Sequence, residues 1–502
     1  MEKALEKKSG IIYLKSKFFL YRIVSYFSFI LIPIWLQKSV SLSPLLEVSV
    51  MSGYLMFMMG QWFLLGKEID HRLKIYYRVN SSIDRVIYRL LLGMIFMIIY
   101  FNIVNFLPFK WVYNVFWVTW GALGLFYSWP TRGKIIEESV SSNFSEFRYL
   151  DSFEKTLLAL ICALFFISIP QVPELNNFEA LKLFFDPKNN INSWYWNFLS
   201  VSYIPFWKYP SLFRMATSLH FYVVGCGMFL LCLYGLLRFL VSRRLSLLGV
   251  FALISSWSFS KILAANISDS IAATFLLLWI WSTLWAAKSS TYRSGLFLGL
   301  IIYYGSLINS FWSIVGVINL ALFIQLYIKE KTMWFKRQVI KYASFGIILS
   351  VIVGLFSDSA FIEHIEIFHF EHLSYFKNII TRKAFYSLSI FGLIIIGMKY
   401  ISQNNSVINR FNFDIEKLEQ ILISFFFVFL LSFFCDHSIV KTFGFMWPVV
   451  LFSLLPIELI FQSITRLRSK RNMIYAIYII ICLADSHIEG RVKILARFLK
   501  NF

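Results

Sequence analysis

Charged residues are scarce in this chain of 502 residues: they make up 15% of it, whereas hydrophobic residues make up 58%. Soluble domains usually carry about 25% charged residues. Apolar stretches long enough to cross a bilayer recur from one end of the sequence to the other, and no soluble domain of ordinary size fits between them. The composition therefore excludes an ordinary soluble protein and predicts an integral membrane protein.

Cysteine is also rare, and its placement excludes a disulfide framework. The five cysteines fall within apolar runs and form no Cys-x-x-Cys pair, so we interpret them as small core residues. The formal net charge is +21, yet no basic domain stands apart from the apolar runs. The Lys and Arg residues lie in short loops beside those runs, as at cytoplasmic membrane edges. This placement argues against a nucleic-acid partner.

The apolar segments predict an all-α, polytopic integral membrane protein with about fourteen or fifteen transmembrane helices of roughly 20 residues each. The first segment lacks a following cleavage site and is too long for a signal-peptide core, so we expect it to be retained. One run, 294–328, is split into two spans by length. The predicted spans lie near residues 18–36, 49–66, 87–107, 110–127, 154–170, 217–241, 245–263, 268–287, 294–308, 309–328, 341–357, 384–400, 418–435, 444–463 and 473–485.

Basic loops alternate along these spans, and cytoplasmic loops carry the excess of Lys and Arg. The segments predicted inside are the N-terminus, 67–86, 128–153, Arg243–Arg244, 329–341 and 466–471. The segments predicted outside are 171–216, the start of the run at Asp269, 358–383 and 436–443. The basic tail after residue 485 falls outside if the last span is real, and inside if that span is an interfacial segment.

We divide the chain into three regions. Residues 1–150 form a four-helix N-terminal membrane region, and 151–357 form a central membrane module with 171–216 as its first outer loop. Residues 358–502 form C-terminal membrane helices, with an outer loop at 358–383 and a basic tail. A composition rich in Phe, Ile and Lys favours a bacterial inner membrane, with the N-terminus cytoplasmic.

Asp269 opens an apolar run in the central module. A carboxylate at helix depth in a membrane is costly, which makes it a candidate functional residue. The alternative is a helix cap or first-turn acid, which the helix dipole favours. Lys261, eight residues earlier, lies in the same predicted outer turn, where its ammonium can pair with Asp269 or with a phosphate.

The first outer loop is rich in acids and aromatics. Glu174 lies just past the preceding span, where a carboxylate can serve as a general base for an acceptor hydroxyl. Glu179 and Asp186 compete for that role. Trp194 and Trp196 suit stacking against a sugar, and equally suit the headgroup layer, where the loop would form interfacial helices without a ligand.

A second outer segment, 358–372, combines acids with His364, His369 and His372. In a helix this spacing would allow a divalent metal site. No His-Glu-x-x-His pattern is present, and the alternative is a solvated amphipathic loop.

Five parts follow one another in order within residues 154–328. They are the outward span 154–170, the loop with Glu174, the lead Phe213-Arg214-Met215-Ala216-Thr217-Ser218-Leu219, the basic inner turn at Arg243–Arg244, and Ala265-Asn266-Ile267-Ser268-Asp269 before an apolar run. This order resembles the GT-C superfamily of glycosyltransferases that use a polyprenyl-phosphate sugar, such as the protein O-mannosyltransferases and the aminoarabinose transferases. The family often has Arg where Asn266 stands.

The resemblance implies inverting transfer of a sugar from a polyprenyl-phosphate donor to a lipid, glycan or protein acceptor at the outer face, among membrane lipids. Glu174 would be the base, and Asp269 would orient the acceptor, the donor or a metal. Arg214 and Lys261 would offset the donor phosphate charge. The resemblance leaves open whether a divalent cation takes part.

Two other functions compete with the transferase. A transporter or flippase of lipid-linked glycans should show repeated halves and broken helices near the midplane, and the sequence has no clear internal repeat. A non-catalytic membrane protein of the same fold is the other alternative.

The N-terminal region adds a fainter likeness. Gly66-Lys67-Glu68-Ile69-Asp70-His71-Arg72 and Phe126-Tyr127-Ser128-Trp129-Pro130-Thr131-Arg132-Gly133-Lys134 resemble the front half of UbiA-type prenyltransferases. The Asp-rich diphosphate motif of that family is absent, so the likeness implies a lipid-handling or structural remnant.

Overall fold

The computed structural model confirms an all-α chain. It describes residues 2–39, 44–73, 82–128, 149–169, 194–256, 259, 270–289, 291–308, 311–328, 337–356, 388–394, 446–463, 470–484 and 486–500. Over these ranges helices are joined by short turns, and none of the ranges contains a strand.

The helices follow the predicted spans closely. The N-terminal region has α1 (Glu2–Ser39), α2 (Pro44–Leu73), α3 (Ser82–Asn105) and α4 (Phe109–Ser128). The central module has α7 (Ser152–Ile167), α9 (Trp194–Ser202), the 3-10 helix η3 (Ile204–Phe206), α10 (Pro210–Leu219), the π-helix η4 (His220–Cys226), α11 (Gly227–Leu240), α12 (Arg243–Ser255), α14 (Ser270–Ser289), α15 (Tyr292–Ile308), α16 (Phe311–Ile328) and α17 (Arg337–Phe356). The C-terminal region has α22 (Met446–Ser463), α23 (Arg471–Ala484) and α24 (Ile488–Lys500).

Two predicted boundaries are informative. The break within the apolar run 294–328 is confirmed, because α15 ends at Ile308 and α16 begins at Phe311. The span expected from residue 217 begins earlier, at Pro210, because proline is favoured in the first turn of a helix. The predicted span 418–435 lies outside the described residues, and 384–400 is described only over 388–394.

Four helical segments of the described part are long and apolar enough to cross a membrane: Leu20–Lys38, Leu45–Arg72, Asp84–Asn105 and Pro210–Arg238. The last joins α10, η4 and α11. Helices α23 and α24 qualify together, as one segment bent by 57°. Others, such as α12 with 13 residues, are shorter than a bilayer requires. The chain thus has the long apolar helices of an integral membrane protein, while the number of spans stays a prediction.

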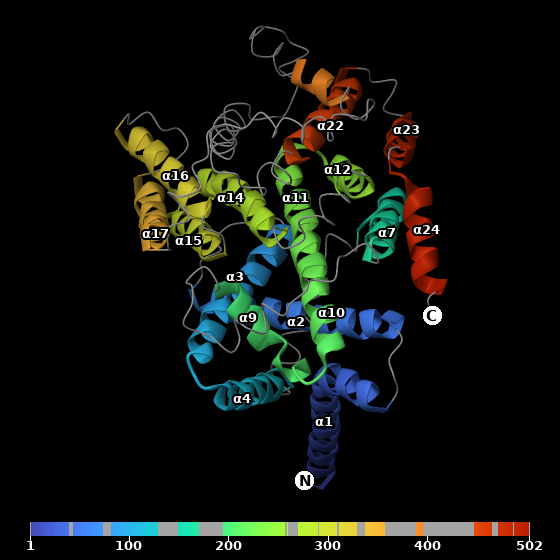
Figure 1. Cartoon of the computed structure of the whole chain (residues 1–502), viewed down its shortest axis with the longest axis vertical. Coiled ribbons are helices and arrows are strands. Elements are labelled where there is room, and N and C mark those ends of the chain that lie inside the picture. Colours follow the sequence, from blue (N-terminus) through green and yellow to red (C-terminus); the bar gives the residue numbers. More distant parts are fainter. Residues whose placement is uncertain are drawn as a thin grey trace.

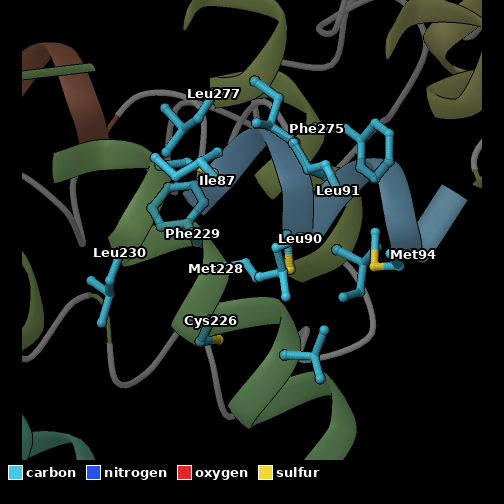
Figure 2. Close-up of a cluster of buried hydrophobic side chains, with 14 of the residues drawn as sticks. Ile87, Leu90, Leu91, Met94, Cys226, Met228, Phe229, Leu230, Phe275 and Leu277 are labelled. Atoms are coloured by element: carbon cyan, nitrogen blue, oxygen red, sulfur yellow. The ribbon is translucent and has the colours of Figure 1, made fainter. Parts of the chain in front are cut away.

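Helix α11 runs through the centre of the molecule, with α14 to α17 on one side and α7, α12, α23 and α24 on the other (Figure 1). One part of the core lies where α11 meets α3 and α14 (Figure 2). Buried side chains of α3 such as Ile87 and Leu91 face Met228 and Phe229 of α11 and Phe275 of α14. Within a bilayer such close packing, rather than exclusion from water, holds helices together.

The start of α7 is fixed by charge. Asp151 and Glu154 form a capping box, in which each side chain accepts a hydrogen bond from the other residue's backbone N–H. Both acids are then paired with the turn before α12: Arg243 binds Glu154 through two bonds of 2.7 Å, and Arg244 pairs with Asp151. The basic pair expected at the inner edge therefore joins the starts of α7 and α12.

The opposite ends of these two helices also meet. Arg491 of α24 donates to Ser168, just past the end of α7, and to the Ser256 carbonyl, just past the end of α12. The segment formed by α23 and α24 runs in the same direction as α7. Tyr475 on α23 lies beside the start of α7, because its ring is 5.5 Å from that of Phe153. The three segments therefore run parallel, and Arg491 lies at the end opposite Arg243 and Arg244.

This register predicts the side of the C-terminal tail, which the sequence left open. We expect a cysteine replacing Lys493 to react with a membrane-impermeant maleimide in intact cells. A cysteine replacing Tyr149, beside Arg243, should react only after permeabilisation. Both variants are made with the five native cysteines replaced. Labelling of both positions from the same side would contradict the parallel arrangement.

Candidate functional site

Most of the residues singled out from the sequence lie outside the described part of the structure. These are Glu174, Glu179, Asp186, Lys261, Asp269, His364, His369 and His372. Trp194 and Trp196 lie on α9, but their side chains are outside the described part. Arg214 is described and lies on α10, within a helix rather than in a loop. The described elements that flank these residues define the surroundings of the candidate site.

The flanking elements converge on the π-helix η4, beginning with the end of α7. The Tyr222 hydroxyl donates to the Phe165 carbonyl at 2.6 Å, and the two rings stack with centroids 4.5 Å apart. Phe165 lies in the last turn of α7, which leads into the loop that carries Glu174. The root of the first outer loop is thus fastened to η4.

The start of α14 is fastened to the same π-helix. Ser270 donates to the Phe221 carbonyl at 2.8 Å, and Thr274 donates to the Gly225 carbonyl at 2.9 Å. A π-helix departs from the regular pattern of backbone bonds, and such segments occur frequently at functional sites. The two hydroxyls, one turn apart on α14, bind carbonyls of that irregular segment. Ser270 directly follows Asp269 in the sequence.

A third element, the described end of the first outer loop, reaches η4 through His220. The Tyr195 hydroxyl lies 2.5 Å from His220 Nε2, and the Tyr203 hydroxyl lies 2.6 Å from Nδ1. A neutral imidazole has one N–H donor and one bare acceptor nitrogen. One tyrosine therefore donates to the ring, and the other accepts from it. Burial raises the pKa of both phenols, which stay protonated.

Aromatic rings close the space around this Tyr195–His220–Tyr203 cluster. The rings of Phe221, Trp62 and Phe198 lie 5.9 to 6.2 Å from the imidazole, centroid to centroid. All of these side chains are almost completely buried. Since water cannot replace a lost partner in such a place, each hydrogen bond of the cluster is costly to break. The cluster therefore holds the loop segment to the helix.

The buried position of α9 and η3 differs from the expectation for the aromatic part of the loop. We expected this segment either in the headgroup layer or against a sugar. Instead, Phe198 and Phe206 are fully buried, and the Tyr54 hydroxyl of α2 donates to the Ser202 carbonyl at 2.8 Å. The described aromatics of the loop pack into the protein because α2 and η4 offer them both apolar surface and hydrogen-bond partners.

Arg214 lies half-buried on α10, one turn from Ser211, which accepts a 3.4 Å hydrogen bond from Gln37 of α1. Within the described ranges Arg214 forms no ion pair. No described carboxylate therefore neutralises its guanidinium. Those ranges also hold no group of three His, Cys, Asp or Glu residues that could bind a metal ion.

The hydrogen bonds of His220, Tyr195, Tyr203 and Arg491 were not predicted from the sequence. One signal was present: an ionisable residue within an apolar run is a functional candidate by default, and His220 stands in such a run. The π-helix has no comparable signature, because its residues are as apolar as those of any span.

Comparison of the chain with protein-family models, with curated proteins and with solved structures found no significant match.

Proposed function

We propose that the chain is a membrane glycosyltransferase that moves a sugar from a polyprenyl-phosphate donor to a lipid, glycan or protein acceptor at the outer face. One observation supports it most: the end of α7 and the start of α14 both bind η4, through Phe165 and Ser270. The first leads towards Glu174, and the second directly follows Asp269. The fold thus brings the roots of two carboxylate-bearing segments, far apart in the sequence, to one helical turn.

In the proposed reaction Glu174 takes the proton from an acceptor hydroxyl as its oxygen attacks the anomeric carbon. The bond from that carbon to the phosphate oxygen breaks, and polyprenyl phosphate leaves with the electron pair. Arg214 and Lys261 offset the charge that develops on the phosphate. Asp269 orients the acceptor or the donor. Attack opposite the leaving group inverts the configuration at the anomeric carbon.

The test is transfer by the purified protein in lipid nanodiscs, supplied with polyprenyl-phosphate sugars and an envelope extract as acceptor. We expect Glu174→Gln to lower the rate by about 100-fold or more, which is the usual contribution of a general base. Asp269→Asn should lower it as well. Glu489→Gln is the matched control, because Glu489 is exposed and, among the described residues, pairs with Lys493 of its own helix.

Full activity of Glu174→Gln would mean that Glu179 or Asp186 is the general base, and the same assay tests variants of both. Full activity of both Glu174→Gln and Asp269→Asn would contradict the shared site. Movement of the donor across vesicles without any transfer would favour the transporter.

A further inference from the structure

We propose that α24 is a strap, and that its buried Arg491 is a positioning residue for the two loops that carry Glu174 and Asp269. The proposal rests on the function proposed above for those two residues. Arg491 is 1% exposed and binds four oxygens. Nη1 donates to the Ile254 carbonyl at 3.0 Å and the Ser168 hydroxyl at 3.5 Å, and Nη2 donates to the carbonyls of Ser255 and Ser256 at 3.1 and 3.0 Å.

The end of α12 explains why a cation is accommodated there. The last carbonyls of a helix lack partners within the helix and carry its partial negative charge. Ile254, Ser255 and Ser256 are the last residues of α12 and its C-cap. A guanidinium is a rigid, planar fork of donors, so one side chain can bind several of these carbonyls at once. All four oxygens that it binds within the described ranges belong to neutral groups. The partial negative charge at the end of α12 therefore compensates the positive charge of the guanidinium.

The four contacts join the end of α7 to the end of α12. Ser168 is the C-cap of α7 and lies three residues before the first outer loop. Ser256 is the C-cap of α12 and begins the connection to Asp269 and α14. One guanidinium therefore fixes the roots of both loops relative to each other.

The helix before the strap also contacts α7. Tyr475 on α23 packs against Phe153, one helix length before Arg491. Between them the chain turns at His487, whose φ of 46° lies in the left-handed region, and α24 departs from α23 by 57°. Histidine is among the non-glycine residues that adopt this conformation most readily. Beyond the bend, α24 passes the end of α7, where Arg491 contacts Ser168.

The experiment compares Arg491→Met, which keeps the length of the side chain but not its donors, with Arg491→Lys and with Lys493→Met on the exposed face of the same helix. Hydrogen exchange is measured over residues 165–175 and 253–270, together with kcat and KM for sugar transfer. We expect Arg491→Met to raise exchange in both segments by at least about 10-fold and to lower kcat by at least about 10-fold. KM should change less than about 2-fold.

Arg491→Lys keeps the charge and folds with a milder defect, so its exchange and kcat should fall between those of the wild type and of Arg491→Met. Lys493→Met should match the wild type in both. Unchanged exchange in Arg491→Met and Arg491→Lys would overturn the strap. Raised exchange with unchanged kcat would overturn the positioning role of Arg491. Raised exchange in a chain whose wild type transfers no sugar would overturn the proposed function and the positioning role together, leaving α24 a structural brace.

Discussion

Replacing His220 by leucine is expected to lower the free energy of unfolding by about 2–6 kcal/mol, since it strips two buried phenols of their partner at about 1–3 kcal/mol each. Among the described residues, the imidazole of His220 is the group of η4 that hydrogen-bonds the hydroxyls of Tyr195 and Tyr203, at 2.5 and 2.6 Å. His220 and both tyrosines are almost completely buried, and the rings of Trp62 and Phe198 lie beside the imidazole. Unfolding in mild detergent, followed by circular dichroism, measures the change.

A triple variant separates hydrogen bonding from packing. Replacing both partners of a buried hydrogen bond by apolar groups of similar shape can be nearly neutral. His220→Leu combined with Tyr195→Phe and Tyr203→Phe should therefore be more stable than His220→Leu alone. His71→Leu, at an exposed position of α2, serves as control and should change stability by less than about 0.5 kcal/mol. A triple variant less stable than the single one would show that the ring shape, and not the hydrogen bonds, holds α9.

The helices could be predicted because their signal is local. Apolar length marks each span, and a length argument alone placed the break between α15 and α16 within two residues of its position. The turn at Arg243 was predicted from charge, and the structure explains that charge: Asp151 and Glu154 need partners where α7 begins. Composition and loop charge therefore predict where helices begin and end.

The contacts that build the candidate site could not be predicted in the same way. Arg491 lies more than 230 residues from the carbonyls that it binds, and nothing near it in the sequence marks it as buried. It reads as one of the basic residues of an exposed tail. Likewise, Asp70 stands nearly alone among the acids of its part of the sequence, yet its carboxylate accepts a 3.2 Å hydrogen bond from Arg89 of α3. Pairings of this kind depend on which helices pack together.

Gly66→Ala should destabilise the protein by about 1–3 kcal/mol, the usual cost of overpacking. A Cβ at Gly66 on α2 would overlap the carbonyl group of Arg89 on α3 and lie 2.8 Å from the Gly93 nitrogen. These are backbone atoms, so no side-chain rotation relieves the overlap, and the helices must separate. Gly60→Ala on the same helix is the matched control, because a Cβ there meets nothing within 4 Å. It should be neutral or stabilising by up to about 1 kcal/mol, from helix propensity.

The close approach of α2 and α3 also affects the His220 cluster. A Cβ at Gly93 would overlap the backbone of Trp62, whose ring borders His220. Residues that act on one shared contact show non-additive effects, whereas distant ones add. We expect Gly93→Ala combined with His220→Leu to cost less than the sum of the two single changes by at least about 0.5 kcal/mol. Gly60→Ala combined with His220→Leu should be additive. Additivity in both pairs would mean that the position of Trp62 does not depend on how closely α2 and α3 approach.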